Sequence, residues 1–372
     1  MPSPSTCRKS KLGRSSLTIL FSLFPQEVIF KIVNNSSPAP APKYSILMPS
    51  FRSLRFLEEC LGSLLNLAGP SYEVLFLDNG SPEPEADWVE KNMVDPKFRV
   101  FKLPDTRFFT GGVNFLAEHA RGEFVVLFNS DTRVDANWLQ VLDAYLQATG
   151  YEGANSDVRE MSHPEKSADE SFSLDPFGLT HFLPMQASNS IPPLFVRGLG
   201  LAMKRTLFNE LGKLDDDFKM YFEEIDLCWR AGLQNYRIGY APGAIIYHVG
   251  QGSSTKSFFL WNRFRGRRNR IWAFLKNAGP LLLAVFIPFH LLICLFSILG
   301  NLLIGRFKNS AAEVAAVTAA FYNIRIPLSK RGKIQKERKI PDAELVRRGF
   351  IVLRIKFLHR ILDSIFQARN RA

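Results

Sequence analysis

Cysteine is scarce in this sequence, and its cysteines follow no pairing or metal-binding rhythm. The 372 residues contain only Cys7, Cys60, Cys228 and Cys294. Disulfide-stabilised secreted scaffolds and structural zinc sites need several cysteines at short, regular intervals. The sequence therefore excludes a disulfide framework and a cysteine-rich zinc module, and it predicts a reducing compartment.

Acidic residues are few at both ends of the chain. The formal net charge is +12, with +4 in residues 1–42 and +10 in residues 307–372, so the middle of the chain is slightly acidic. The excess cations lie beside apolar stretches rather than on the folded middle. This distribution predicts an anionic membrane surface as a partner, and no nucleic acid.

One long stretch has no charged side chain at all. Residues 277–305 contain no Asp, Glu, Lys or Arg, and they exceed the roughly 20 residues that a helix needs to cross a bilayer. Basic residues flank both sides and favour the cytoplasmic side for each flank, while Pro280 and Pro288 favour a broken helix. We therefore expect an in-plane or re-entrant segment; a single span and a helix packed on the folded domain are the alternatives.

Composition divides the chain into four segments. Residues 1–42 are a basic, Ser- and Pro-rich lead-in, and their apolar run 17–24 is too short to span a membrane. Residues 43–262 form the folded domain, 263–306 a basic collar and the apolar membrane segment, and 307–372 a basic tail. The end of that tail, about 343–368, has the spacing of an amphipathic helix lying on a membrane surface.

The folded segment alternates apolar strands with helical patterns, which predicts an α/β fold with a mainly parallel sheet covered on both faces. A long polar loop is expected at 150–193, because no period is visible there. The expected strands are 44–48, 72–81, 98–103, 124–132, 236–242 and 244–249, and the expected helices are 54–67, 85–93, 110–122, 136–148 and 220–233.

Ligands of such sheets bind beyond the carboxyl ends of the strands. Asp131 ends an apolar strand, where a carboxylate suits a hard cation such as Mg²⁺, although it could instead cap a turn. Asp78 could likewise be an ordinary turn residue of an Asp-Asn-Gly sequence. The polar groups expected at three strand ends are Pro49 with Ser50, Asp78, and Asn129 with Ser130 and Asp131.

Four stretches then occur in order: ILMPSF, LFLDNGS, LFNSDT, and YFEEIDLCWRAG followed by YHVGQGSS. Together they make residues 44–254 resemble a family 2 glycosyltransferase of the nucleotide-sugar-binding GT-A type, most of all its bacterial rhamnosyltransferase-like branch. The resemblance implies an inverting hexosyltransferase that moves a sugar, with rhamnose as a candidate, from a nucleotide-diphosphate sugar to a lipid-linked or polysaccharide acceptor. It also implies cell-envelope glycan synthesis at the cytoplasmic face of the inner membrane.

The resemblance assigns roles to particular residues. Glu224 is the implied general base, although the family usually has Asp there, so Glu223 stays a candidate; an acidic first helical turn is the structural alternative. His248 is either a metal ligand or a structural histidine. The implied metal is Mg²⁺ or Mn²⁺ on Asp131 and His248, and the implied nucleotide-sugar residues are Pro49, Ser50, Asp78, Gly111, Gly112, Asn114, Asn129, Ser130 and Asp131.

Two other classes of protein are weighed against this interpretation. A sugar nucleotidyltransferase needs a glycine-rich, basic loop after its first strand, and MPSFRSLR has no glycine. A catalytically degenerate, membrane-bound partner protein would be favoured by loss of Asp131 or of the Glu223–Glu224 pair, and all three acids are present.

Overall fold

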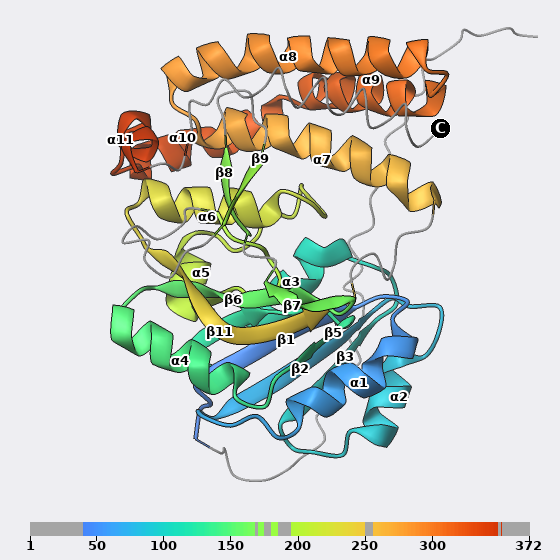
Figure 1. The fold of residues 1–372 in the computed structure, drawn as a ribbon, viewed down its shortest axis with the longest axis vertical. Helices are drawn as coiled ribbons and strands as arrows, with labels where there is room; N and C mark the ends of the chain where they lie inside the picture. Colours follow the sequence, from blue (N-terminus) through green and yellow to red (C-terminus); the bar gives the residue numbers. More distant parts are fainter. Residues whose placement is uncertain are drawn as a thin grey trace, which may run out of the picture.

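The computed structural model describes residues 40–167, 170–174, 180–184, 195–249, 256–348 and 351. Within these residues, a sheet has helices on both faces, and a group of further helices lies beyond the helices of one face (Figure 1). Most of the expected lead-in, most of the amphipathic stretch 343–368, and Cys7 fall outside the described residues.

The first half of the domain alternates strands and helices, as the sequence predicts. Strands β3, β2, β1 and β4 pair in parallel in that order, because each helix returns the chain to the same edge of the sheet. The elements are β1 Tyr44–Ser50, α1 Leu54–Leu64, β2 Tyr72–Asn79, α2 Glu85–Asn92, β3 Phe98–Leu103, α3 Phe108–His119, β4 Phe124–Leu127, β5 Thr132–Val134 and α4 Trp138–Thr149.

The second half extends this sheet with mixed pairing, in the order β4-β10-β6-β11-β5, with β7 on β6. Strand β10 is antiparallel to both neighbours, whereas β11 is parallel to β6 and antiparallel to β5. The expected α/β fold is confirmed. The elements are β6 Gly153–Glu160, β7 His163–Ser167, β8 Glu170–Leu174, β9 Thr180–Pro184, β10 Ala202–Lys204, α5 Arg205–Glu210, α6 Glu223–Leu233 and β11 Ile238–His248.

The expected loop at 150–193 is wrong, because it contains β6 in the middle of the sheet as well as β7, β8 and β9. Strand β6 is buried but polar. Its Asn155 amide donates to the carbonyl oxygens of Arg197 and Leu199 at 2.9 and 3.0 Å, and the Ser156 hydroxyl donates to that of Gly200. Polar side chains satisfied in this way leave no apolar pattern to read in the sequence.

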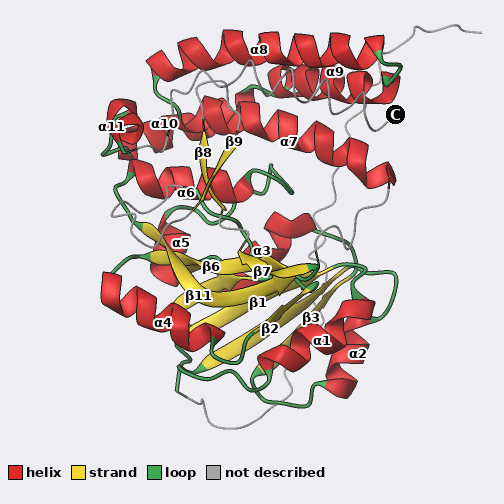
Figure 2. Cartoon of the chain, in the orientation of Figure 1, coloured by secondary structure: helices red, strands yellow, loops and turns green. Residues whose placement is uncertain are grey.

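Each face of the sheet has its own hydrophobic core. Along β1, Ile46 and Met48 pack with α1, α2 and α4, whereas Leu47 points to the face covered by α3, α5 and α6 (Figure 2). The core on the face covered by α3, α5 and α6 extends beyond α6. It continues without a break into the helices that follow, through Phe274 and Phe286, whose rings stack at 3.6 Å between centroids.

Five helices complete the described chain: α7 Lys256–Asn277, α8 Pro280–Leu303, α9 Phe307–Tyr322, α10 Arg325–Glu337 and α11 Asp342–Arg347. The domain boundary expected at residues 262–263 falls inside α7. The expected break in the apolar segment is wrong, because α8 is continuous and contains Pro288. Pro280 opens the helix, where its missing N–H has no helical partner to lose, and packing against α7 and α9 supports the rest.

A buried carboxylate joins three of these helices. Glu313 of α9 is fully buried and accepts hydrogen bonds from Arg263 and Arg267 of α7 at 3.0 and 2.6 Å, and from Ser297 of α8. Burial alone would raise the pKa of Glu313, but the charges and hydrogen bonds of Arg267 and Arg263 outweigh it and lower the pKa. Part of the expected basic collar therefore serves as internal structure.

Candidate active site

Asp131 and His248 come from distant parts of the sequence and meet at the edge of the sheet. Strand β5 follows the turn after β4 and pairs with the end of β11, where Thr132 lies opposite His248. The Val249 amide donates to the Asp131 carbonyl oxygen at 3.1 Å. Asp131 Oδ1 then lies 3.3 Å from His248 Nε2, and both side chains are partly exposed.

This pair is compatible with a divalent cation. Two adjacent ligands of an octahedral Mg²⁺, each about 2.1 Å from the ion, are about 3 Å apart, close to the observed separation of 3.3 Å. The described residues contain no group of three or more His, Cys, Asp or Glu side chains able to hold a metal. A cation held by Asp131 and His248 would therefore take its other ligands from a bound phosphate and from water.

Asp78 at the end of β2 is engaged in local structure. It is 1% exposed, and its two carboxylate oxygens accept hydrogen bonds from the backbone amides of Ser81 at 2.9 Å and Ala86 at 3.2 Å. The second contact satisfies a free amide in the first turn of α2, as a capping residue would. These contacts are those expected of a turn residue, and base recognition by Asp78 stays a prediction.

The glycine-rich start of α3 packs closely on the ends of β1 and β2. A Cβ on Gly112 would lie 2.8 Å from Cβ of Pro49, and one on Gly111 would lie 2.8 Å from Cβ of Arg107. Asn114 is bonded to the loop before α6, since its amide donates to the Leu214 carbonyl oxygen and to the Asp216 carboxylate, both at 2.8 Å. Close packing therefore accounts for the two glycines.

The sequence prediction missed Asn79, which holds this turn in place. Phe108 has a φ of +57°, an uncommon conformation for a residue with a side chain. The Asn79 amide donates to the Phe108 carbonyl oxygen at 2.8 Å, and its oxygen accepts the Arg107 amide at 2.9 Å. In the sequence it reads only as the second residue of an Asp-Asn-Gly turn, so no local signal marks it.

A second missed residue is Glu85, the first residue of α2. It is fully buried near the end of β1, where it accepts a hydrogen bond from the backbone amide of Ser53. Burial raises the pKa of Glu85. Glu85 therefore lies near Ser50 and Asp78 at the strand ends. The sequence contains no sign of its burial, because Glu85 follows a turn rich in proline and glutamate.

Glu223 and Glu224 form the first turn of α6. Glu223 is 7% exposed, and Glu224 is half-buried, in contact range of Gly198. Burial raises the pKa of both carboxyls; the Glu224 charge raises the pKa of Glu223 further, whereas the Arg197 charge opposes the rise at Glu224. Because each negative charge disfavours the other, the pair favours a state with one proton and one negative charge.

The third acid of this turn has a structural role. Asp226 is fully buried and accepts hydrogen bonds from Arg230 of its own helix at 2.9 Å, and from Lys276 at 2.9 Å and Asn277 at 2.8 Å on α7. Arg230 pairs with Asp226, four residues earlier on the same helix. Among the described contacts, Glu223 and Glu224 therefore have no ion-pair partner, whereas Asp226 anchors the helix to α7.

The segment that precedes β10 connects the Glu223–Glu224 pair to the end of β4. Gly200 and Leu201 bond to Leu127, the last residue of β4, with the Gly200 amide donating to the Leu127 carbonyl oxygen at 2.9 Å. Gly198, three residues from Leu201 on the same segment, faces Glu224. One short connection therefore joins the end of β4, just before Asp131, to the start of α6.

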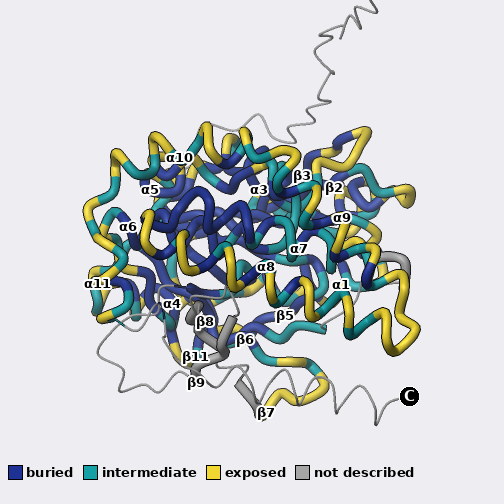
Figure 3. Tube along the Cα trace, turned by 90° about the horizontal axis from the view of Figure 1, so that it is seen from above, coloured by how far each residue is buried: buried dark blue, intermediate teal, exposed yellow. Residues whose placement is uncertain are grey.

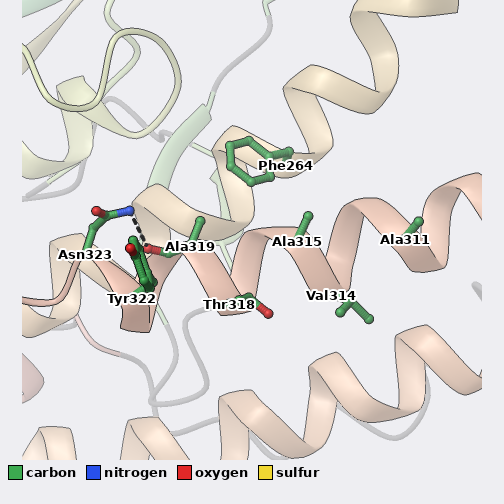
Figure 4. Close-up of a pocket in the computed structure, with 8 residues that line it drawn as sticks. All are labelled: Phe264, Ala311, Val314, Ala315, Thr318, Ala319, Tyr322 and Asn323. Carbon is green, nitrogen blue, oxygen red and sulfur yellow. Dashed lines mark hydrogen bonds between the residues drawn. The ribbon is translucent and has the colours of Figure 1, made fainter. Parts of the chain in front are cut away.

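Two cavities lie elsewhere. A groove of about 670 Å³ runs between α7 and α9, with Phe264 opposite a row of small and apolar α9 residues (Figure 4). A cavity of about 660 Å³ lies between α3, α6 and α10 and includes Asn114 in its lining. The lining of these two cavities does not include Asp131, His248, Glu223 or Glu224.

Fold and strand ends together define the class of protein: an α/β domain of the GT-A type. Residues 45–212 match the family model described as glycosyl transferase family 2. Over these residues the chain matches a family 2 glycosyltransferase domain, in agreement with the family and the fold expected from the sequence. The rhamnosyltransferase-like branch stays a prediction.

The chain is also similar to curated proteins of glycan synthesis. It is 24% identical over 240 residues to the low-salt glycan biosynthesis hexosyltransferase Agl10 of Haloferax volcanii, covering 60% of this chain and 73% of that protein. It is 27% identical over 235 residues to the O-antigen biosynthesis protein RfbC of Myxococcus xanthus, covering 55% of this chain but only 18% of that protein.

A solved structure supports the same fold. The structure of GalNAc-T7 with UDP, GalNAc and Mn²⁺ aligns with a TM-score of 0.50 at 13% identity, over 64% of this chain and 48% of that chain. Likeness at this identity concerns the fold alone.

Proposed function

We propose that this chain is an inverting, metal-dependent glycosyltransferase that moves a sugar from a nucleotide-diphosphate donor to a lipid-linked or polysaccharide acceptor in cell-envelope glycan synthesis. The observation that carries the proposal is the position of Asp131 and His248, which lie 3.3 Å apart at the carboxyl edge of the sheet. The segment before β10 connects this edge to the Glu223–Glu224 pair. The names of Agl10 and RfbC, a hexosyltransferase of glycan synthesis and an O-antigen protein, support the acceptor class. Rhamnose is the sugar that we propose to test first.

The proposed chemistry follows from the charges of these side chains. A bound Mg²⁺ or Mn²⁺ would neutralise charge on the leaving diphosphate. Asp131 and His248 hold that end of the donor, and Pro49, Ser50 and Asp78 line the base end. Glu224, the base that the family resemblance implies, takes the proton of the acceptor hydroxyl as that oxygen attacks the anomeric carbon from the opposite side.

A donor screen tests this function. We expect the full chain to bind one nucleotide-diphosphate sugar in titration calorimetry, with an affinity that rises at least about tenfold when Mg²⁺ or Mn²⁺ is present, and to hydrolyse that donor slowly. The full chain is needed because Lys276 and Asn277 anchor Asp226 and the core continues into α8. Absence of metal-dependent binding across uridine, guanosine and thymidine diphosphate sugars would contradict the proposal.

We further propose that α8 lies in the plane of a membrane at its cytoplasmic face. It is the one helix among the described residues that is long and apolar enough to cross a bilayer. One side packs on α7 and α9 through Leu282, Phe286 and Cys294, while the other side is exposed (Figures 1 and 3). A helix supported along its length by the protein suits an in-plane position better than a free span.

The exposed side of α8 is strongly apolar. Phe296 is 60% exposed, and Arg306 and Lys308 follow at the turn into α9, where they suit anionic head groups. The exposed apolar side chains of α8 are Leu281, Val285, Phe289, Leu292, Leu295, Phe296, Leu299, Leu302 and Leu303.

Charging this surface should release the protein from membranes. We expect the triple variant Leu292→Glu, Leu295→Glu and Leu299→Glu to lower partitioning onto anionic vesicles at least about 100-fold, since burying one leucine contributes about 1.5–3 kcal/mol. Vesicle flotation measures this. Val94→Glu is the matched control, because Val94 is 87% exposed on the far side of the domain. Resistance of the wild-type chain to carbonate extraction would instead support a single span.

A further inference from the structure

Helix α7 borders the segment that leads into the acid pair. Three of its residues, Arg265, Arg268 and Asn269, lie within little more than one helical turn and face residues 217–221. The side chain of Asn269 is fully buried. None of these residues was singled out by the sequence for the active site, because their helix is separated from it by the whole of β11.

The segment that α7 contacts has an unusual backbone. Lys219, Tyr221 and Phe222 have φ values of +65°, +69° and +71°. Residues with side chains rarely adopt this left-handed region, and they persist there only where the surroundings hold them. Phe222 immediately precedes Glu223, so any relaxation of this backbone would reorient the first turn of α6.

Asn269 holds this backbone through three carbonyl groups. Its Nδ2 lies 3.0 Å from the oxygen of Phe218, 2.9 Å from that of Met220 and 2.7 Å from that of Tyr221. An amide has two hydrogens, so one of them is shared between two acceptors. These contacts hold the segment just before Lys219, between Lys219 and Tyr221, and at Tyr221 itself.

Two arginines extend the contact. Arg268 donates to the Asp217 carbonyl oxygen at 2.8 Å, and Arg265 donates to that of Phe218 at 3.3 Å. On its other side, the Lys219 carbonyl oxygen accepts the Thr110 amide at 3.2 Å. The segment therefore lies between α7 and the start of α3, and it connects the glycine-rich turn to the acid pair.

We propose that Asn269 is a positioning residue for transfer, which keeps Glu223 and Glu224 in place by holding the segment 218–222 with its three left-handed residues. The inference rests on the proposed function. It makes α7 a part of the catalytic apparatus as well as the support of α8.

Asn269→Ala should lower kcat for transfer about 10- to 100-fold, the loss expected when a reacting group moves by about 1 Å, while the donor KM changes less than about threefold. The pH profile should change as well. If the segment relaxes and water reaches the pair, burial no longer raises the pKa of the acids, so the acidic limb of kcat moves to lower pH. A merely structural loss would lower the amount of folded enzyme without moving that limb.

Two further variants make the test specific. Lys219→Gly in the Asn269→Ala background should restore kcat severalfold, because glycine adopts φ +65° without strain. Asn262→Ala, on the same helix seven residues earlier and with no bond to 217–221 among the described contacts, should keep wild-type kcat and pH profile. If Asn269→Ala unfolds below the assay temperature, Asn269→Ser, which keeps one donor hydrogen, should give an intermediate kcat.

The positioning role would be overturned if the wild type transfers sugar and a folded Asn269→Ala or Asn269→Ser variant has the same kcat and pH profile. Failure of Lys219→Gly to restore any activity would overturn the backbone account. A wild type that binds no nucleotide sugar contradicts the proposed function instead, so the two failures are distinguishable.

Discussion

Glu224→Gln is expected to bind the donor with wild-type affinity and to lose transfer by about 10²–10⁴-fold, the usual contribution of a positioned general base. Glutamine keeps the shape and polarity of the buried side chain but cannot accept the proton of the acceptor hydroxyl. Donor affinity from calorimetry and kcat from acceptor glycosylation separate the two effects. A variant that transfers at the wild-type rate would place the base elsewhere.

Glu223→Gln distinguishes between the two acids. Burial and the Glu224 charge raise the pKa of Glu223 well above its ordinary value, and glutamine mimics the protonated form of this carboxyl. We expect a loss of less than about tenfold, smaller than for Glu224→Gln, because no proton acceptor is removed. The reverse order of the two losses would make Glu223 the base.

The pH dependence provides an independent readout. A general base acts as the carboxylate, so kcat falls as the pH decreases through its pKa. Because burial raises the pKa of Glu224, this acidic limb should lie above the ordinary glutamate range of about 4.3. The limb should persist in Glu223→Gln and be absent from the residual activity of Glu224→Gln.

The first half of the fold could be predicted because its strands are buried on both faces. Strands β1, β2 and β4 read as continuous apolar runs, and a helix pattern separates each from the next. Asp131 and His248 lie close together although 117 positions separate them, and their role as metal ligands stays a prediction. They meet because β5 pairs antiparallel with the end of β11, where Thr132 lies opposite His248.

Strand β6 and the Asn269 contact could not be predicted, for a shared reason. In both, a buried amide satisfies backbone carbonyl groups far away in the sequence: Asn155 those of 197 and 199, Asn269 those of 218, 220 and 221. An asparagine has the same appearance in a solvated loop and in such a contact. Only the tertiary structure tells which carbonyl groups it reaches.

Asp131→Asn is expected to abolish metal-dependent donor binding and to lower transfer at least about a hundredfold. Asp131 is the one carboxylate of the Asp131–His248 pair, and a hard cation loses most of its attraction when that charge is removed. Donor calorimetry with and without Mn²⁺ measures the loss directly, and Mn²⁺ should no longer change the donor affinity of the variant. A metal dependence equal to that of the wild type would exclude Asp131 as a ligand.

Asn129→Asp is the complementary variant. Asn129 offers only a neutral oxygen two residues before Asp131, so the protein contributes a single negative charge and the diphosphate must supply most of the rest. A second carboxylate should therefore raise the affinity for Mn²⁺ in the absence of donor, by about tenfold or more, because each added carboxylate ligand strengthens binding of a hard cation. Manganese paramagnetic resonance of the free protein reports this without any turnover. No gain in affinity would mean that Asn129 faces away from the cation, and that the donor diphosphate binds next to Asp131 and His248 alone.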